Sequence, residues 1–308
     1  MALVGDRLRI RVDAPIRVRF QTDGDETMKH PWALLAVACA AAAGPALAET
    51  TLCTEIASLP ATITAQGTYC LHEHLATALS VGNAIEIATN NVTIDCNDHK
   101  IGGLAAGPGT QAYGIHATGR SNVTIRHCSL RGFKAGINLE GGGYHVVEDS
   151  RFDNNTWVGI RVDGGGSAIR RNVVSDTGGW GTGSRGIIAI GGVDVIDNAV
   201  GNVFADLDGG NTGVIGIQVA DPLGAAVTGN RIRGLVPDTS GTLTGIISIG
   251  SGPIDINGNV IQAAAGASDF GVNCSSGGGT ARDNTFLGFS AADASVNCVE
   301  SGSLVPPP

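Results

Sequence analysis

The stretch that decides the fold runs from Ala112 to Asp163 and reads AYGIHATGRSNVTIRHCSLRGFKAGINLEGGGYHVVEDSRFDNNTWVGIRVD. A Gly-Ile pair opens a short strand in which apolar and polar residues alternate. A glycine break follows, and a second alternating strand ends in a small or polar residue that one further position separates from an apolar residue. Alternation with a period of two is typical of β-strands, whose successive side chains point to opposite faces.

The Gly-Ile pair recurs along most of the chain. Its copies are Gly114-Ile115, Gly136-Ile137, Gly159-Ile160, Gly186-Ile187, Gly216-Ile217, Gly245-Ile246 and Gly271-Val272. The steps between the glycines are 22, 23, 27, 30, 29 and 26 residues. A period in the twenties with strand alternation predicts a solenoid whose units stack their apolar faces.

The second strand of each unit also ends in register. The slot is filled by Cys128, Ser150, Asn172, Asn198, Asn230, Asn259 and Asn284, and Asn97 fits it one unit earlier. Asparagine tolerates the left-handed backbone of a tight corner. Stacked about 4.8 Å apart, asparagine amides can donate to one neighbour and accept from the next. The spacing therefore predicts an asparagine ladder rather than isolated turn residues.

These repeats resemble the right-handed parallel β-helix of the pectate-lyase-like superfamily, as it occurs in many secreted bacterial proteins. The resemblance covers about Asn83 to Phe289. It implies an all-β solenoid of about eight coils with capped ends. It implies no particular activity, because this architecture hosts lyases, hydrolases, epimerases, tailspikes and adhesins.

The N-terminal region has the features of an export signal. Met28-Lys29-His30 forms a basic start, Trp32–Ala43 is apolar, and Ala46-Leu47-Ala48 is an A-x-A cleavage site. We therefore expect a signal peptide at 28–48 and a protein that is secreted or periplasmic. Residues 1–27 are expected to be an extension that arises from a misassigned start.

The predicted organisation of the remaining chain has three parts. Residues 49–82 are expected to form an N-terminal cap and a first partial coil, residues 83–289 the β-helix, and residues 290–308 a C-terminal cap and tail. Six Lys or Arg and five Asp or Glu lie in residues 1–48, so residues 49–308 carry 13 basic and 23 acidic residues, a net charge of −10. This charge argues against nucleic acid as a partner, and no further apolar stretch predicts membrane insertion.

Six cysteines remain after Cys39 leaves with the signal peptide. An even number in an exported chain predicts disulfides, and six cysteines allow fifteen pairings. The pairs that are local in sequence are favoured: Cys53–Cys70, Cys96–Cys128 and Cys274–Cys298. The middle pair lies one position out of register.

Three long connections leave from the same point of consecutive coils, at 175–185, 201–215 and 233–244. We expect them to form a ridge that carries Asp176, Trp180, Asp206 and Asp208. Loops on a rigid scaffold commonly hold functional residues. Trp180, Asp206 and Asp208 are therefore candidates for binding a substrate.

The outward positions of the Gly-Ile strand gather polar residues on three early coils. These residues are His116, Asn138, Glu140, Arg161 and Asp163. Coil stacking places Glu140 and Asp163 roughly 5 Å apart, a spacing suited to paired catalytic carboxylates or to a shared calcium ion. The catalytic candidates are His116, Glu140, Arg161 and Asp163, with Asn138 as a binding residue. In the lyases that share this architecture an arginine acts as base beside acidic calcium ligands, a part that Arg161 could take. The alternative is a solvated face with Glu140 and Arg161 paired across coils.

Two further outward patterns accompany this cluster. Arg126, Glu148 and Arg170 alternate in sign on the second strand, as a structural charge ladder would. Ile188, Ile190, Ile247 and Ile249 occupy outward positions of later coils, and we expect a loop, a cap or a partner to cover them.

Signatures of enzymes with this fold are mostly absent. The Asn-Thr-Asp, Asp-Asp and Gly-His-Gly elements of polygalacturonases are missing, and Arg231-Ile232-Arg233 lies inside an ordinary repeat. Asp221-Pro222-Leu223 lacks the histidine of the Asp-Pro-His-Asp signature of mannuronan epimerases. Two functions stay open: a protein that binds and could cleave an extended polysaccharide, as a lyase or a glycoside hydrolase, or a non-catalytic structural or surface protein.

Overall fold

The computed structural model describes residues 11–13, 17–19, 52–181, 183–206, 213–239, 241–263, 269–275 and 278–306. The chain divides into two compact units, Met1–Thr51 and Leu52–Pro308. In the first unit, β1 (Arg11–Asp13) pairs antiparallel with β2 (Arg17–Arg19). The expected signal peptide at 28–48 lies outside the described residues.

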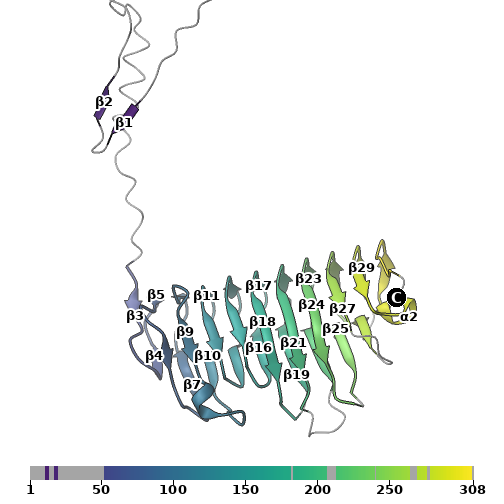
Figure 1. Ribbon diagram of the computed structural model, residues 1–308, viewed down its shortest axis with the longest axis horizontal. Coiled ribbons are helices and arrows are strands. Elements are labelled where there is room, and N and C mark those ends of the chain that lie inside the picture. The colour runs from purple at the N-terminus through teal and green to yellow at the C-terminus, as the bar shows by residue number, and fades with distance from the viewer. Residues whose placement is uncertain are drawn as a thin grey trace, which may run out of the picture. The chain divides into compact units, whose positions relative to one another are not determined.

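The second unit is a solenoid whose strands form three parallel sheets (Figure 1). The first sheet contains β4 (Ala61–Ile63), β7 (Asn83–Ile87), β10 (Tyr113–Thr118), β13 (Ala135–Glu140), β16 (Val158–Asp163), β19 (Ser184–Ile190), β22 (Val214–Ala220), β25 (Leu243–Ile249), β28 (Phe270–Cys274) and β31 (Ser295–Val296). The second sheet contains β3 (Thr54–Glu55), β5 (Gly67–Cys70), β8 (Val92–Asp95), β11 (Val123–Arg126), β14 (Val146–Glu148), β17 (Ala168–Arg170), β20 (Asp194–Ile196), β23 (Ala225–Thr228), β26 (Ile254–Asn257), β29 (Gly279–Arg282) and β32 (Val299–Ser301). The third sheet contains β6 (Leu75–Ala76), β9 (Lys100–Gly102), β12 (Ser129–Arg131), β15 (Arg151–Asp153), β18 (Val173–Gly178), β21 (Ala199–Phe204), β24 (Arg231–Val236), β27 (Val260–Gln262) and β30 (Thr285–Leu287).

Each coil contributes one strand to each sheet, and equivalent strands of successive coils are hydrogen-bonded. From β7 to β30 the described residues form eight such coils, as the repeats predict. The strands of residues 54–76 and 295–301 join the same sheets at the two ends. The helices are short: a 3-10 turn at η1 (Leu104–Ala106) and α2 (Ala291–Ala294), where the Ser290 side chain accepts from the backbone N–H of Asp293.

The Gly-Ile pair places its apolar residue in the core, as expected from the alternation. Ile115, Ile137, Ile160 and their equivalents up to Val272 are fully buried and stack in one column. Burying an aliphatic side chain of this size contributes roughly 1.5–3 kcal/mol relative to leaving it exposed. Each coil therefore adds one aliphatic side chain to the column, and the hydrophobic core extends along the whole length of the solenoid.

The glycines of these pairs are required by close packing and not by a turn. None of the seven has a left-handed φ. A Cβ on Gly216 would come within 3.0 Å of the carbonyl oxygen of Gly245 and of the Ile232 side chain, and the other six meet equivalent neighbours in the next coil and the core. The first strand of each coil can thus lie against the third only where the side chain is absent.

The predicted asparagine ladder is confirmed. Asn198 donates through Nδ2 to Oδ1 of Asn230 at 3.0 Å, and its own Oδ1 accepts from Asn172 at 3.1 Å. The contact repeats from Asn230 to Asn259 and from Asn259 to Asn284, always toward the C-terminal neighbour. The same oxygens also accept from backbone N–H groups of the preceding coil.

One physical reason given for the ladder was wrong. None of the ladder asparagines from Asn172 onward adopts the left-handed backbone; the residue before each does. These corner residues are Arg171, Asp197, Gly229, Gly258 and Asp283, with His127 and Asp149 in the two preceding coils. Asparagine therefore occupies the slot for its side-chain amide, and the adjacent position makes the turn.

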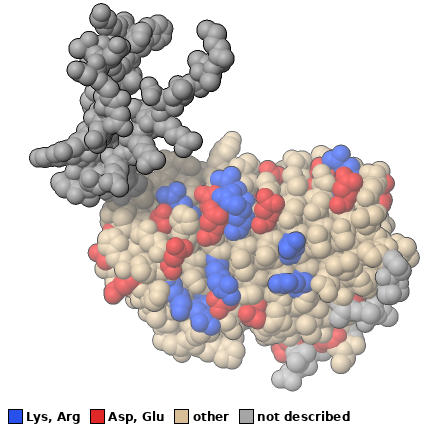
Figure 2. Space-filling view, turned by 45° about the horizontal axis from the view of Figure 1, so that its top comes forward, with Lys and Arg blue, Asp and Glu red and all other residues tan. Residues whose placement is uncertain are grey.

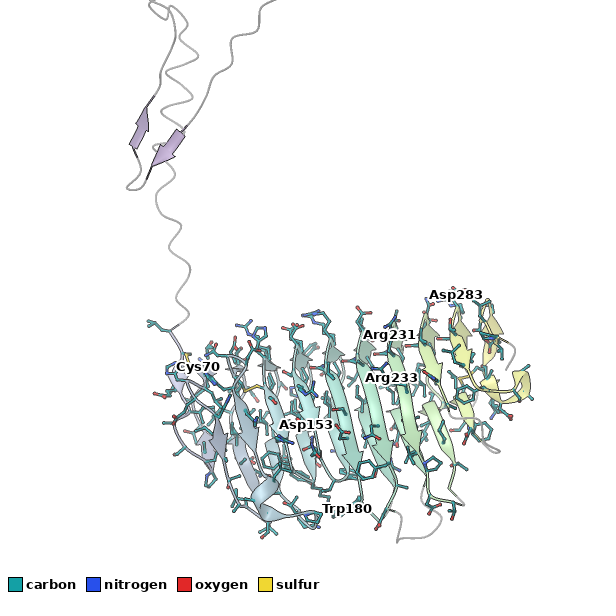
Figure 3. The ribbon with its side chains drawn as sticks, viewed as in Figure 1. Cys70, Asp153, Trp180, Arg231, Arg233 and Asp283 are labelled. Carbon is teal, nitrogen blue, oxygen red and sulfur yellow. A yellow bond between two sulfur atoms is a disulfide. The ribbon has the colours of Figure 1, made fainter. Side chains whose placement is uncertain are left out.

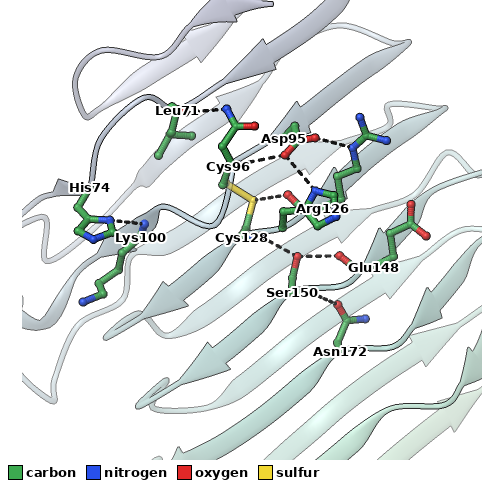
Figure 4. Close-up of a disulfide and its surroundings, with 12 residues drawn as sticks. Leu71, His74, Asp95, Cys96, Lys100, Arg126, Cys128, Glu148, Ser150 and Asn172 are labelled. Atoms are coloured by element: carbon green, nitrogen blue, oxygen red, sulfur yellow. Dashed lines mark hydrogen bonds and ion pairs between the residues drawn. A yellow bond between two sulfur atoms is a disulfide. The ribbon is translucent and has the colours of Figure 1, made fainter. Parts of the chain in front are cut away.

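Serines terminate the ladder at both ends. The backbone N–H of Cys128 donates to Ser150 Oγ at 3.0 Å, and that of Ser150 donates to Asn172 Oδ1 at 3.1 Å (Figure 4). At the other end, the N–H of Asn284 donates to Ser303 Oγ at 3.2 Å. Asn97 departs from the register: it has a left-handed φ, and its amide donates to the Leu71 carbonyl.

The three expected disulfides are present. Cys53–Cys70 and Cys274–Cys298 link the terminal coils, and Cys96–Cys128 joins two early coils across a Cα–Cα distance of 4.8 Å (Figure 4). Cross-links that close loops of this length contribute roughly 3 kcal/mol each, by restricting the unfolded chain.

We predict that Asn230→Ala lowers stability by several times the effect of an exposed substitution. The change leaves the buried backbone N–H of Asn198 without its acceptor, at about 1–3 kcal/mol, and removes one of the three acceptors of the Asn198 side-chain amide. The measurement is the urea midpoint by circular dichroism. Asn257→Ala, on the outer face of β26, is the control. Equal urea midpoints for the two variants would show that the asparagine ladder does not contribute measurably to stability.

A second prediction concerns the glycine column. Gly216→Ala should destabilise the protein by about 1–3 kcal/mol, because overpacking of a tight core shifts the neighbours. Gly109→Ala is a matched control, since its Cβ would meet nothing within 4 Å and its φ is unrestricted. Differential scanning calorimetry compares the two, and a Gly216→Ala protein as stable as the control would refute the packing argument.

Candidate functional site

The outer face of the first sheet carries the residues that the sequence singles out. Hydrogen-bonded register places His116 beside Asn138, and Asn138 beside Arg161. In the parallel row, Thr118 lies beside Glu140. Inward neighbours on both sides are fully buried core residues, so these strands hold the polar side chains on the surface of a rigid sheet.

Arg161 is the centre of this polar group. Its Nη1 lies 2.8 Å from Glu140 Oε1 and donates to Asn138 Oδ1 at 3.0 Å, while Nη2 lies 3.8 Å from Asp163. Asn138 is 1% exposed and donates in turn to Glu140 at 3.1 Å. We call these four residues, Asn138, Glu140, Arg161 and Asp163, the Arg161 cluster. The guanidinium thus directs its N–H donors at two carboxylates and one amide oxygen, an arrangement that can bind the polar groups of a ligand.

His116 forms a separate pair at the N-terminal side of the cluster. Its Nδ1 lies 2.8 Å from Glu86 Oε2, and the amide of Asn83 lies 3.3 Å from the same nitrogen. Nε2 lies 3.3 Å from the Thr118 hydroxyl. The structure thus gives His116 an acidic partner that the sequence analysis did not name.

Three aromatic side chains gather beside the Arg161 cluster, around one lysine. Lys134 Nζ lies 4.7 Å from the ring centroid of Trp180, 5.6 Å from that of Trp157 and 5.9 Å from that of Tyr113. Each contact is within the range of a cation–π interaction. We call Tyr113, Lys134, Trp157 and Trp180 the aromatic cluster; all four are partly exposed. Figure 3 labels Trp180 at the lower edge of the solenoid.

The aromatic cluster contacts His116 and lies near Glu140 and Arg161 of the Arg161 cluster. The Tyr113 ring stacks on His116 with centroids 5.4 Å apart. Burial raises the pKa of Tyr113, the nearby Glu140 carboxylate raises it further, and Arg161 opposes them. Tyr113 is therefore uncharged at neutral pH and presents a ring face and a hydroxyl to the same surface.

The outward isoleucines have different environments. Ile188 is 4% exposed and packs with Ala135, Val158 and the partly buried rings of Tyr113 and Trp157. Other parts of the chain therefore cover it, as expected. Ile249 remains 40% exposed.

The long connections follow strands that are themselves extended. Asp176 Oδ1 accepts from the Asn202 amide, and Trp180 lies in the connection between β18 and β19. Asp206 has a partner of its own and lies near Gly181. Asp208 lies outside the described residues. Trp180 reaches Lys134, and no described contact links Asp176 to the Arg161 cluster.

Charges on the second sheet form the structural ladder that alternation predicts. Arg126 lies 2.8 Å from Asp95, and Arg170 lies 2.8 Å from Glu148. Burial raises the pKa of Asp95, but hydrogen bonds from the Asn97 N–H, His127 and Arg126 lower it below its usual value. These pairs lie away from the aromatic cluster and serve the coil stack.

One group of potential metal ligands carries no metal chemistry. Ligand atoms of Cys53, Cys70 and His72 lie within 4.8 Å of one another. Both sulfurs are joined in the disulfide, so neither is a thiolate that could bind an ion.

Lys134, Tyr113 and Trp157 were missed as site residues. The only two tryptophans after residue 48 are Trp157 and Trp180, and only Trp180 lies in one of the predicted long connections. They meet because the end of one coil returns beside the start of the next strand. Trp157 lies one residue before β16, and Trp180 lies in the loop before β19. Because both precede a strand of the first sheet, the sequence could have predicted that they lie on the same edge of that sheet.

Residues 76–214 match the family described as a right-handed β-helix region. The described solenoid is a right-handed parallel β-helix. The match covers three strands of each coil from β7 to β21, and the stacked sheets continue the same architecture to β32.

Two solved structures resemble the β-helix at low identity. A mannuronan C-5 epimerase A-module from Azotobacter vinelandii is 13% identical over 90% of this chain and 94% of its own, with a TM-score of 0.46. A tailspike protein mutant of the E. coli bacteriophage HK620, in complex with a pentasaccharide, is 13% identical over 79% of this chain and 52% of its own, with a TM-score of 0.37. No curated protein matches the chain.

Calcium binding by Glu140 and Asp163 remains a prediction. It can be tested by removing Arg161, which pairs with both carboxylates. The guanidinium competes with a cation for both carboxylates. We therefore expect calcium to raise the melting temperature more in Arg161→Ala than in the wild type. Arg170→Ala, which breaks an ion pair on the second sheet, is the control. The same calcium effect in all three proteins would place any bound calcium elsewhere.

Proposed function

We propose that this β-helix binds an extended polysaccharide along the outer face of its first sheet. The observation that carries the proposal is the aromatic cluster: Trp157, Trp180 and Tyr113 meet around Lys134 beside the Arg161 cluster. Amphipathic rings offer large apolar area with a polar edge, and ligand sites combine such rings with a few fixed polar groups.

The regular stacking of the coils favours an extended ligand and not a compact one. One outward row carries Glu86, His116, Asn138 and Arg161 on four successive coils, of which Asn138 is buried, and Gln218 follows one coil beyond Ile188. Successive strands of a sheet lie about 4.8 Å apart. A chain laid along the stack can therefore meet an equivalent position on each coil it crosses.

The ion pairing favours binding without turnover. Arg161 is shared between the Glu140 and Asp163 carboxylates, and His116 is paired with Glu86, so each catalytic candidate already has a charged or hydrogen-bonding neighbour. A lyase that used Arg161 as base would have to release the guanidinium from both partners. Cleavage is consequently the second candidate, and His116, Glu140, Arg161 and Asp163 are its residues.

Export fits the same proposal. Three disulfides are typical of proteins that fold in an oxidising compartment. The described residues contain no helix long and apolar enough to cross a membrane. We infer that the protein acts on the periplasmic or extracellular side, where polysaccharides are available.

The test is a glycan screen with neutral and acidic polysaccharides, with and without calcium. We predict binding that Trp157→Ala weakens about tenfold, because one stacked ring contributes roughly 1–2 kcal/mol. Tyr144→Ala is the control, since this ring is 71% exposed and lies at the corner before the second sheet. Equal affinities for both variants would disprove a site at the aromatic cluster.

Turnover is followed in the same screen by reducing ends and by the ultraviolet absorbance of unsaturated products. Product that Arg161→Ala or Asp163→Ala abolishes would establish an enzyme at the Arg161 cluster. Binding without product would leave a carbohydrate-binding protein. If no glycan binds and no product forms, the remaining function is that of a non-catalytic structural or surface protein.

A further inference from the structure

A second face of the solenoid holds two arginines whose side chains have no hydrogen-bond or ion-pair partner among the described residues. Among the arginines of the described β-helix, Arg126, Arg131, Arg151, Arg161, Arg170, Arg171 and Arg282 lie within 4.0 Å of a carboxylate. Arg120 and Arg185 donate to carbonyl or amide oxygens. Arg231 and Arg233, both exposed on β24, have neither kind of contact.

The register of the third sheet places no acid directly beside either arginine, and the nearby Asp176 carboxylate accepts a hydrogen bond from Asn202. Arg231 lies between Ala199 and Val260, and Arg233 lies beside Gly201. The nearest acid in the same row is Asp153, three coils away or roughly 14 Å. Asp153 is itself engaged by Arg131 at 3.1 Å. Figure 3 labels Asp153, Arg231 and Arg233 on this face, and Figure 2 shows a largely tan area in which blue is isolated from red.

The surface in front of these arginines is hollowed. Small residues, Ser175 and Gly201, occupy the row between Asp153 and Arg233, so no side chain fills the space. The hollow has a volume of about 510 Å³ and continues into a second of about 370 Å³. We define the Arg231–Arg233 groove by six of the residues that line the two hollows: Ser175, Gly201, Asn202, Arg231, Arg233 and Gln262.

A bend in three successive strands makes the hollow. Asp176, Asn202 and Gly234 have left-handed φ values of 52°, 51° and 64° in the middle of β18, β21 and β24. These strands run for six residues, whereas β15 and β27 on either side have three. The strands therefore turn at the bend and continue inward with Thr177, Val203 and Leu235, which are buried.

The groove also offers neutral hydrogen-bonding groups. Ser175 Oγ is buried without a partner within the described residues, and a rotation about its χ1 angle would present it to the groove. The Gln262 amide is exposed and makes no described hydrogen bond, and Asn202 donates only to Asp176. Two cations with amide and hydroxyl groups beside them, in a hollow of a few hundred Å³, match a polar anionic ligand.

We propose that the Arg231–Arg233 groove is a separate binding site for an acidic saccharide, one that carries carboxylate or sulfate groups. Arginine recognises both oxyanions through paired N–H donors, and the neighbouring amides suit sugar hydroxyls. A nucleic acid is disfavoured, because residues 49–308 have a net charge of −10 that repels a polyphosphate. The site is independent of the aromatic cluster, which lies on the first sheet.

The test titrates the full-length protein, with its disulfides oxidised, by isothermal calorimetry. The probes are a trisaccharide of galacturonic acid, a sulfated disaccharide, a neutral trisaccharide and a single-stranded oligonucleotide. We expect at least one of the two acidic saccharides to bind and the neutral one not to bind at this site. Raising salt from 50 to 300 mM should weaken the binding, because exposed charges are screened over about 8 Å or less.

The decisive variants are Arg231→Ala with Arg233→Ala, against Arg282→Ala. The double variant should lose about tenfold in affinity for the acidic probe, as expected for two charge-assisted contacts. Arg282, an exposed arginine paired with Asp255 on the second sheet, should leave the affinity unchanged. The double variant and the wild type should have the same unfolding midpoint, because neither arginine side chain makes a hydrogen bond or an ion pair with the described residues.

Three results would overturn the assignment. Acidic saccharide that binds the double variant as tightly as the wild type would exclude the groove, and loss of that binding in Trp157→Ala would transfer it to the aromatic cluster. No binding of either acidic probe would exclude the ligand class. An oligonucleotide that binds more tightly than both, with the same dependence on Arg231 and Arg233, would replace the saccharide with nucleic acid. Failure here leaves the proposed function untouched, since that is tested through Trp157.

Discussion

Hydrogen bonding from coil to coil is the interaction on which the rest of this structure depends. Every strand pairs with the equivalent strand of the next coil, so each side chain has a neighbour of the same register about 4.8 Å away. Inward positions must then be apolar in every coil, and buried polar positions must satisfy one another. The asparagine ladder meets the second condition, because each amide is both donor and acceptor. Outward positions are constrained too, since like charges in one row repel.

That constraint gives meaning to the residues that do not follow it. Most arginines of the solenoid face a carboxylate in a neighbouring coil, as Arg170 faces Glu148. Lys134 instead lies over three aromatic rings, and Arg231 and Arg233 lie over small residues. Lys134 joins rings that come from three other coils, so its contacts also hold coils together. Arg231 and Arg233 make no side-chain hydrogen bond or ion pair with the described residues, and the groove proposed above rests on this difference.

Periodicity made the fold and the pairing of coils predictable from the sequence, because the same few positions recur with the same residue types. It placed Arg161 beside Asn138, while the preference for pairs that are local in sequence gave the three disulfides. Periodicity did not predict contacts between residues that occupy different positions in their coils. The left-handed corner belongs to Arg171 and its equivalents, and the repeating glycine avoids a clash with the next coil. Lys134, Trp157 and Trp180 meet across connections of unequal length, and spacing in the sequence carries no such information.

The ladder has a direction, and this has a consequence for how such a chain can change in length. Asn172, Asn198, Asn230 and Asn259 each donate to the asparagine of the next coil toward the C-terminus, and a serine hydroxyl closes the series at each end. A duplicated coil inserted between Asn198 and Asn230 would present a donor and an acceptor in the right order. The two ends would meet the same neighbours as before. The molecule can thus gain or lose whole coils as modular units, and the reach of its lateral faces can be altered in steps of one strand spacing while its capped ends stay the same.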